Sequence, residues 1–442
     1  MSSTSLGYRA AVRLGSALAP ALAHYSPKIR EGHRARLGAG ERLCRWARGS
    51  RDRQRPLVWL HASSVGEGLQ AESVLDELRR LRPDCQYLYT HFSSSAAPLA
   101  RRLAADAADY LPYDLRSQVD PLLDALAPDL LVFAKLDLWP ELATRAAARG
   151  STVAIVAGTV SSSSGRLRWP ARSLLRAGYE TVTAAGVISH ADGERLARLG
   201  VDRKRIEVLG DPRFDSVLHR VQVVSPGDPL LSFGSGAPTM VAGSTWPGDE
   251  AVLLDAFSRI RSSRPEAQLI LVPHEPTPDH LAALERASAR AGLPRPVRLE
   301  TAEGPTPLLV VDRVGILATL YGGGAMAYVG GGFGRAGLHS VLEPAAWGLP
   351  VIFGPRWESS RDAGLLLQAG AAEALPGTGA REAGAALYSR WKSWLESEAL
   401  RRSQGRRARE VVEQGAGAAR RSAELLDRLT PPRGRPHGWR TG

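Results

Sequence analysis

The sequence predicts an α/β protein with two tandem domains, each built on a doubly wound parallel sheet. Short β-rich apolar runs alternate with amphipathic helical segments from residue 57 onward, which is typical of parallel strands covered by helices on both faces. A stretch rich in Pro, Gly and Ser at residues 223–238 interrupts this alternation, which then starts again. The length of 442 residues accommodates both domains, since a domain typically spans about 100–200 residues.

The strands of the first domain are expected in these runs: Leu57–His61, Tyr87–Thr90, Leu130–Ala134, Val153–Ala157, Ala184–Ser189 and Ile206–Leu209. Those of the second domain are expected at Met240–Ala242, Leu269–Val272, Leu308–Val311, Met326–Val329 and Val351–Phe353. Helices are expected between the strands, for example over Glu67–Leu81, where Val74, Leu75 and Leu78 share one face. We therefore predict domains over residues 57–222 and 239–400, with the segment 223–238 as their linker and a ligand cleft at the carboxyl ends of the strands.

The two ends of the chain carry most of its positive charge. Residues 1–56 hold 12 Lys and Arg against 3 Asp and Glu, and residues 401–442 hold 11 against 4. The body between them carries a net charge of −4, although the whole chain carries +12. This distribution predicts a polyanionic partner, either a membrane surface or nucleic acid. One long helix is expected over residues 401–430, followed by a disordered basic tail over 431–442.

Residues 1–56 are predicted to form a basic amphipathic segment that associates with membranes. Apolar side chains recur in it at helical spacing: Leu14, Leu18, Ala21, Leu22 and Tyr25. Charged residues such as Arg9 and Arg13 interrupt the apolar run, so no spanning helix is expected. A helix that lies in an anionic membrane interface has this pattern. A helix packed on the protein's own body has it too, and composition alone favours neither.

Two candidate catalytic carboxylates follow expected strands of the first domain. In the segment His61–Glu67, Glu67 opens a helix at the carboxyl end of a strand, where it could remove a proton from an alcohol. The alternative is that Glu67 only complements the helix dipole. In the segment Lys135–Pro140, Asp137 and Trp139 would suit a sugar site, or else Asp137 caps a helix and Trp139 packs in the core.

A glycine-rich segment, Gly330–Gly337, follows an expected strand and precedes the helical pattern Leu338–Trp347. It contains the spacing GxGxxG, which predicts that a phosphate approaches backbone amides at a helix N-terminus. The dinucleotide interpretation is weak, because no acidic residue ends the next strand near Phe353. Glu343 could hold a ribose from within the helix instead. The alternative is a tight turn that lets a strand and a helix pack closely.

No metal site and no cofactor are predicted. The segment His274–His280 superficially resembles a metal cluster, but its two prolines prevent a helix that would bring both histidines onto one face. The two cysteines, Cys44 and Cys85, are too few for a thiolate cage or for a disulfide scaffold.

In five blocks the sequence resembles the Kdo transferases, which move 3-deoxy-D-manno-octulosonic acid (Kdo) from CMP-Kdo onto a lipid A precursor. The blocks are His61–Glu67, Lys135–Pro140, Leu209–Asp215, Val241–Asp249 and Tyr328–Pro355. They occur in this order over roughly residues 55–365, so the resemblance is specific. It implies the GT-B fold, in which two Rossmann-like domains face a cleft. It also implies an inverting reaction that uses no metal.

The resemblance implies three catalytic residues. Glu67 matches the general base, and Asp137 matches an acidic residue, usually Glu, that supports the transition state. Arg213 stands where the family has Lys or Arg, which also stabilises the transition state. Residues expected to bind the donor are Pro273, His274, Val314, Gly315, Ile316, Gly331, Gly332, Gly337, Ser340, Val341, Leu342 and Glu343. Departures from the family pattern at Ser340, Lys135 and Val160 concern the donor pocket and the acceptor range.

The implied partners are CMP-Kdo, the phosphorylated glucosamine disaccharide of a lipid A precursor, and the anionic surface of the cell inner membrane. The resemblance places the protein at the cytoplasmic face of that membrane, and no nucleic acid partner is expected. Two alternatives stay open: another GT-B nucleotide-sugar glycosyltransferase or epimerase, and a non-enzymatic protein that binds polyanions or membranes. Glu67, Arg213 and Glu343 argue against the second, since a binding protein does not need them.

Overall fold

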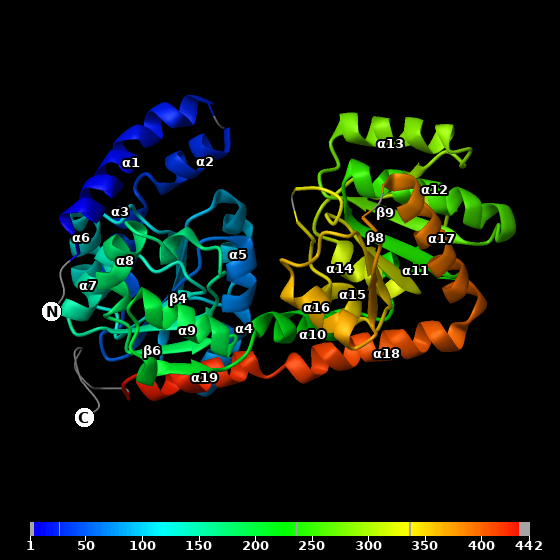
Figure 1. Ribbon diagram of the computed structural model, residues 1–442. Coiled ribbons are helices and arrows are strands. Elements are labelled where there is room, and N and C mark those ends of the chain that lie inside the picture. Colours follow the sequence, from blue (N-terminus) through cyan, green and yellow to red (C-terminus); the bar gives the residue numbers. More distant parts are fainter. Residues whose placement is uncertain (1–3, 26, 236, 336, 378, 433–442) are drawn as a thin grey trace. The chain divides into compact units, whose positions relative to one another are not determined.

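The computed structural model describes residues 4–25, 27–235, 237–335, 337–377 and 379–432, which form two compact units (Figure 1). Unit 1 contains the described residues up to Ser216 and those from Ala416 onward, and unit 2 is Val217–Gly415. Each unit contains a sheet of seven parallel strands. The predicted class, two doubly wound α/β domains in tandem, is therefore confirmed.

The sheet of unit 1 has the strand order β3-β2-β1-β4-β5-β6-β7. Its strands are β1 (Leu57–His61), β2 (Gln86–His91), β3 (Ala107–Tyr110), β4 (Leu130–Ala134), β5 (Thr152–Gly158), β6 (Ala184–Val187) and β7 (Ile206–Val208). Its helices are α1 (Leu6–Tyr25), α2 (Pro27–Arg36), α3 (Ala39–Ser50), α4 (Val65–Leu81), α5 (Ala97–Arg102), α6 (Arg116–Leu126), α7 (Pro140–Ala148), α8 (Ala171–Tyr179), α9 (His190–Leu199) and α19 (Ala418–Leu429). The helix α10 (Pro212–Val223) begins in unit 1 and ends in unit 2.

Two apolar layers cover the sheet of unit 1. Leu43 of α3, Leu123 of α6 and Leu142 of α7 belong to one buried cluster, and side chains of α4, α5 and α19 belong to the other. The central strands β1 and β4 are buried along their whole length, because both of their faces are covered. This explains why their sequences are continuous apolar runs.

The sheet of unit 2 has the strand order β10-β11-β9-β8-β12-β13-β14. Its strands are β8 (Thr239–Thr245), β9 (Gln268–Pro273), β10 (Val297–Arg298), β11 (Leu308–Val310), β12 (Met326–Val329), β13 (Val351–Phe353) and β14 (Ala372–Ala374). Its helices are α11 (Pro229–Ser232), α12 (Pro247–Ser263), α13 (Pro278–Arg290), α14 (Leu317–Leu320), α15 (Leu342–Ala346), α16 (Arg361–Gln368), α17 (Ala380–Glu396) and α18 (Glu398–Gly415). Trp391 and Trp394 of α17 are completely buried in the core of this unit.

The segment boundaries differ from those expected. The units divide within α10, so residues 223–238 lie inside unit 2 and include α11. The long helix predicted over 401–430 is two helices, α18 and α19, because Gly417 adopts a left-handed φ of 87° between them. The helix α19 then packs against α4 of unit 1. Most of the predicted basic tail, from residue 433 onward, lies outside the described residues.

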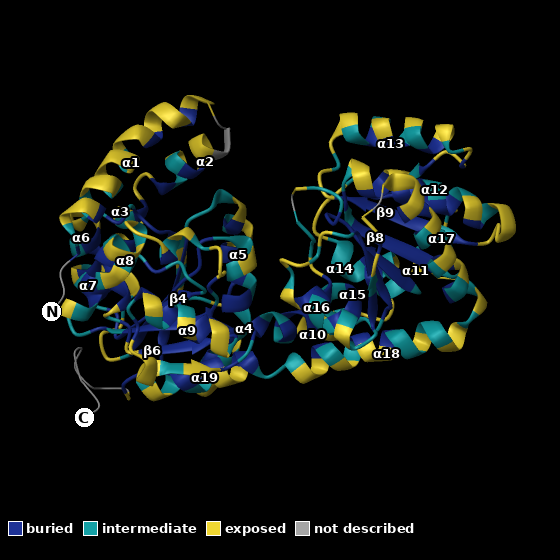
Figure 2. Ribbon diagram, viewed as in Figure 1, coloured by how far each residue is buried: buried dark blue, intermediate teal, exposed yellow. Residues whose placement is uncertain are grey.

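The described residues up to Ser50 include three helices, α1, α2 and α3, that belong to unit 1. The hydroxyl of Tyr8 in α1 donates to Asp114 Oδ2 at 2.7 Å, and Arg9 forms an ion pair with the buried Glu141 at 2.9 Å. Burial raises the pKa of Asp114 to about 6, although its hydrogen bonds oppose that shift. Figure 2 shows that much of the remaining surface of α1 is exposed. None of the described helices is long and apolar enough to cross a membrane.

Candidate functional site

Glu67 lies in the first turn of α4, directly after the carboxyl end of β1. Ser64 caps this helix, and its backbone N–H donates to Glu67 Oε2 at 3.0 Å in a capping box. The other carboxylate oxygen, Oε1, lies 3.9 Å from Lys135 Nζ, and the Glu67 side chain is 15% exposed. The carboxylate is thus held in one orientation but remains accessible.

Asp137 lies on the neighbouring segment, after β4. Arg166 Nη2 donates to Asp137 Oδ1 at 2.8 Å, and the same guanidinium donates to the Leu136 carbonyl. Burial alone would raise the pKa of Asp137, but hydrogen bonds with Ser63 and Arg166 lower it below its usual value. Asp137 is therefore ionised at neutral pH.

A buried histidine connects the two segments that carry Glu67 and Asp137. Trp139 Nε1 donates to His61 Nε2 at 3.0 Å, and His61 Nδ1 lies 3.0 Å from Thr90 Oγ1. Burial lowers the pKa of His61 to about 4, so the ring is neutral and its Nδ1–H donates to Thr90. Sequence reasoning gave no role to His61, because a histidine inside a strand has no distinguishing pattern.

Arg213 lies in the first turn of α10 and is held by the carboxylate of Asp211. Its Nε and Nη2 atoms donate to Asp211 Oδ2 at 2.9 and 2.7 Å. The other oxygen of Asp211 accepts from Gln70 Nε2 at 3.2 Å, and Gln70 lies one helical turn after Glu67. Unit 1 therefore brings all three residues that we expected to be catalytic, Glu67, Asp137 and Arg213, to one edge of its sheet.

In unit 2, Asp249 fixes the start of the glycine-rich segment. This buried carboxylate accepts from the hydroxyl of Tyr328 at 2.8 Å and from the backbone N–H groups of Gly331 and Trp246, both at 3.0 Å. Gly331 has a φ of 98°, and a Cβ on Gly332 would lie 2.6 Å from the backbone of Gly354. Both glycines are thus required by the fold itself.

The helix predicted over Leu338–Trp347 begins four residues later than expected. The described residues between Gly330 and Val341 form turns and loop, and α15 begins only at Leu342. Residues 338–340 have no regular secondary structure, so the glycines do not lead directly into a helix N-terminus. The side chains of Val341 and Leu342 are buried, whereas Ser340 is exposed.

Glu343 occupies the first turn of α15 and pairs with a neighbouring arginine. Arg220 Nη1 donates to Glu343 Oε1 at 2.9 Å. Burial raises the pKa of Glu343, although the Arg220 charge opposes this effect. Val217, Trp347 and Ala318 line the small pocket around this pair.

The remaining residues expected to contact the donor lie at strand ends and in loops of unit 2. Pro273 ends β9, and the ring of His274 stacks against His339 with 4.4 Å between centroids. Val314 is 74% exposed, and Gly315 and Ile316 precede α14.

The two histidines of the segment His274–His280 do not share one site. His280 Nε2 lies 2.9 Å from Glu250 Oε2, whereas His274 stacks on Trp246 with 4.8 Å between ring centroids. Among the described residues, no group of three or more His, Cys, Asp or Glu side chains could hold a metal ion.

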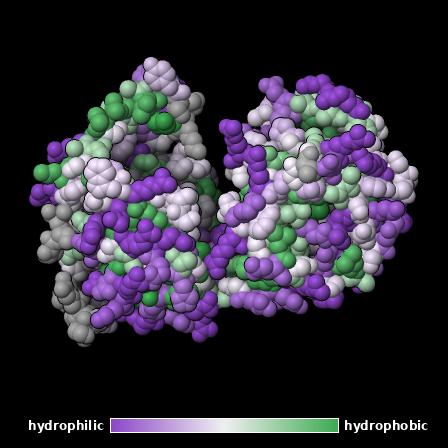
Figure 3. Space-filling view, in the orientation of Figure 1, coloured by the Kyte–Doolittle hydropathy of each residue, from purple (hydrophilic) through white to green (hydrophobic). Residues whose placement is uncertain are grey.

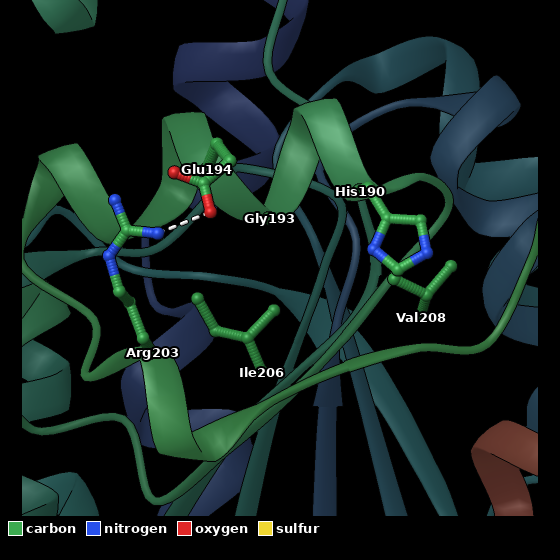
Figure 4. A pocket seen from close by; sticks show the side chains of 6 residues that line it. All are labelled: His190, Gly193, Glu194, Arg203, Ile206 and Val208. Atoms are coloured by element: carbon green, nitrogen blue, oxygen red, sulfur yellow. Dashed lines mark hydrogen bonds and ion pairs between the residues drawn. The ribbon is translucent and has the colours of Figure 1, made fainter.

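A cavity of about 530 Å³ lies apart from all the predicted site residues. It opens between α9 and β7, where Arg203 and Glu194 form an ion pair beside His190, Ile206 and Val208 (Figure 4). Ile206 and Val208 come from the edge strand β7, His190 and Glu194 come from α9, and Arg203 comes from the short turn before β7. None of them matches a motif that we identified in the sequence.

Comparison with known proteins agrees with these observations. The family model described as 3-deoxy-D-manno-octulosonic-acid transferase (kdotransferase) matches residues 35–216. The chain is 29% identical over 386 residues to a 3-deoxy-D-manno-octulosonic acid transferase of Bordetella pertussis, covering 84% of this chain and 86% of that protein. It is 26% identical over 307 residues to a bifunctional glycosyltransferase/methyltransferase of Fusobacterium nucleatum, covering 67% of this chain but only 47% of that longer protein.

Among solved structures, the fold is similar to that of UDP-GlcNAc 2-epimerase from Neisseria meningitidis. The TM-score is 0.58 at 10% identity, and the match covers 84% of this chain and 99% of that one. This similarity shows the GT-B fold and nothing about the reaction. The family model and the sequence matches show that the chain is similar to the Kdo transferases.

Proposed function

We propose that the protein transfers Kdo from CMP-Kdo to the phosphorylated glucosamine disaccharide of a lipid A precursor. The observation that carries this proposal is the position of Glu67. Its carboxylate is oriented and accessible at the carboxyl end of β1, inside the part of the chain that matches the Kdo transferase model. Lys135 and Arg213 supply positive charge to the same edge of unit 1.

In this reaction Glu67 acts as the general base. It accepts the proton of the attacking sugar hydroxyl while the hydroxyl oxygen bonds to the anomeric carbon of Kdo. The bond from that carbon to the phosphate oxygen breaks, and CMP leaves with the bonding electrons. Because attack and departure occur on opposite faces, the anomeric centre is inverted.

The two other predicted catalytic residues stabilise charge. The ionised Asp137 favours positive charge that develops on the sugar ring, and its orientation depends on Ser63 and Arg166. The Arg213 guanidinium suits an anionic group of the donor, either the leaving phosphate or the Kdo carboxylate. Asp211 holds this guanidinium through two hydrogen bonds, which orients it before substrate binds.

Unit 2 is proposed to bind CMP-Kdo. Glu343 accepts hydrogen bonds from ribose hydroxyls, and the backbone of Gly331, Gly332 and Gly337 approaches the phosphate. His274 and Ser340 lie exposed near this segment and complete the polar surface. The chain's own side chains supply the base and the positive charge, so we propose a reaction that needs no metal.

The N-terminal helices are proposed to hold the protein at the cytoplasmic face of the inner membrane. The apolar stripe of α1 is not packed on the body: Leu14, Leu18, Leu22 and Tyr25 are 48–89% exposed. Figure 3 shows apolar side chains gathered over this helix. Exposed leucines beside many arginines favour binding to the interface of an anionic membrane.

A mass-spectrometric assay tests the proposed reaction. The protein is incubated with CMP-Kdo and a phosphorylated lipid A precursor, and both products are followed. We expect the acceptor to gain one or more Kdo residues while CMP is released in equal amount. CMP release without a heavier acceptor, or turnover of a UDP-sugar instead, would contradict the proposal.

A further inference from the structure

A second large cavity, of about 510 Å³, opens in unit 1 beside α3, α6 and the segment that follows β3. Apolar surface comes from Leu37, Cys44, Pro112 and Pro121. Pro112 is buried, Cys44 is half-buried, and Leu37 is 59% exposed. The wall of the cavity is thus partly apolar, and one of its apolar side chains, Leu37, is exposed.

This cavity adjoins the network that holds the catalytic segments. Arg36 lines it, lies 3.7 Å above the centroid of the Phe92 ring and donates to the Phe92 carbonyl at 2.8 Å. The ring of Phe92 lies 5.0 Å from the ring of Trp139, which donates to His61. One aromatic layer therefore separates the cavity from the segment that carries Asp137.

We propose that the cavity holds an acyl chain of the lipid acceptor; this rests on the proposed function. Charged residues that line the cavity, Arg48 and Glu41, are exposed, so an apolar tail enters while a polar head stays in water. Leu37 directly follows α2, whose Ile29 is 42% exposed.

Cys44 provides a direct reporter of occupancy. It lines the cavity, whereas the other cysteine, Cys85, is only 1% exposed. Its alkylation by N-ethylmaleimide is measured by peptide mass spectrometry above neutral pH, because burial raises the pKa of the Cys44 thiol. Monomeric alkyl phosphates of eight to twelve carbons should protect Cys44, with about fourfold tighter binding for each added methylene. Equal protection by inorganic phosphate would identify an anion site and overturn the proposal.

Two glycines of α3 offer a matched pair of variants. A Cβ on Gly40 would make only ordinary contact with Pro112, at 3.6 Å, so Gly40→Phe fills the cavity without displacing the backbone. A Cβ on Gly49 meets nothing within 4 Å, and Gly49 does not line the cavity. By calorimetry, Gly40→Phe should weaken dodecyl phosphate binding at least tenfold, while Gly49→Phe binds as the unchanged protein does. Equal binding by both folded variants would overturn the proposal.

Steady-state kinetics test whether the cavity holds an acyl chain of the acceptor or a chain of some other lipid. In Gly40→Phe, KM for the acylated acceptor should rise at least tenfold, while kcat/KM for the deacylated phosphorylated disaccharide is unchanged. An unchanged KM for the acylated acceptor would overturn the acyl assignment and leave the proposed reaction intact. If the unchanged protein transfers no Kdo to either acceptor, the proposed function fails, and the acceptor assignment fails with it, whatever the alkyl phosphates do.

Discussion

At the level of single residues, the carboxylates of unit 1 differ in what holds them. The Glu67 carboxylate accepts from a backbone N–H and faces the ammonium of Lys135, whereas Asp137 accepts from the guanidinium of Arg166. A guanidinium keeps its charge at every physiological pH and holds Asp137 ionised. The 3.9 Å contact between Glu67 and Lys135 is longer and weaker, which suits a carboxylate that must take up a proton.

Replacing Glu67 by Gln tests its role as the base. Gln preserves the size and still accepts from the Ser64 N–H in a capping box, but it does not take up the proton. We expect kcat on the lipid acceptor to fall by about 10²–10⁴-fold, with donor affinity and thermal stability almost unchanged. Asp76→Asn on the same helix is the control and should leave kcat unchanged. Near-normal turnover in Glu67→Gln would show that the glutamate only caps its helix.

A second residue-scale prediction concerns His91 at the end of β2. Its ring lies 4.1 Å from that of Tyr110, and burial lowers its pKa to about 4. Between pH 6.5 and 4 the unfolded chain binds a proton here that the folded protein does not, so stability falls as pH falls. The free energy of unfolding is measured by urea denaturation at pH 7 and at pH 4.5. Its decrease between these pH values should be about 2 kcal/mol smaller in His91→Phe than in the unchanged protein. Equal losses in both proteins would contradict the buried, neutral histidine.

The sequence predicted that Glu67 and Asp137 both follow strands of one parallel sheet. This was enough to place them at the same edge, because parallel strands present their carboxyl ends along one edge. The same argument could not predict that Arg166 is the partner of Asp137. This residue comes from the short turn η2 (Gly165–Leu167) in a serine-rich loop, and only the path of that loop brings it to Asp137. The partners of a site residue depend on tertiary contacts that no local pattern records.

At the level of elements, the strands that sequence reasoning missed are β3, β10 and β14, and all three lie at sheet edges. Central strands are buried on both faces and have continuous apolar sequences, whereas an edge strand needs few apolar residues. In β3 the sequence is AADY, with only Tyr110 buried, and β10 has two residues. These segments are too short for an alternating apolar pattern to distinguish a strand from a loop.

The helix α15 carries the element-scale prediction. It has five residues, and its Glu343 is held by Arg220 from α10. Replacing Glu343 by Ala should remove the charge-assisted hydrogen bond that we propose to the ribose, which costs about 1.5–3 kcal/mol, or about 10- to 150-fold in affinity for CMP-Kdo. Calorimetry with CMP measures this loss, and Glu358→Ala, an exposed residue of the same unit, is the control. Unchanged affinity in Glu343→Ala would contradict the ribose assignment.

At the level of the whole molecule, the N-terminal segment is part of unit 1 and not an appendage. Leu43 and Ala47 of α3 belong to the core cluster that also contains Leu57 and Trp59. Removing residues 1–56 would therefore expose core side chains and destabilise the unit. The basic composition of this segment predicted a membrane-associating function, but it could not show that the same helices also complete the fold.

The membrane prediction is better tested on the surface of α1. Changing Leu14, Leu18 and Leu22 to Gln removes exposed apolar area without touching the buried contacts of Tyr8, Ala19 and Ala23. Burying a leucine contributes about 1.5–3 kcal/mol, so the triple variant should bind anionic vesicles at least a hundredfold more weakly in sedimentation assays.

The control triple, Leu81→Gln, Val208→Gln and Val223→Gln, removes similarly exposed apolar side chains elsewhere and should bind as the unchanged protein does. Binding by the unchanged protein should also weaken as salt rises, because arginines of the N-terminal helices add electrostatic attraction to the apolar contact. Turnover of a detergent-dispersed acceptor should be the same in all three proteins, since α1 carries none of the proposed catalytic residues. If the α1 variant still binds vesicles as the unchanged protein does, another surface of the protein binds the membrane.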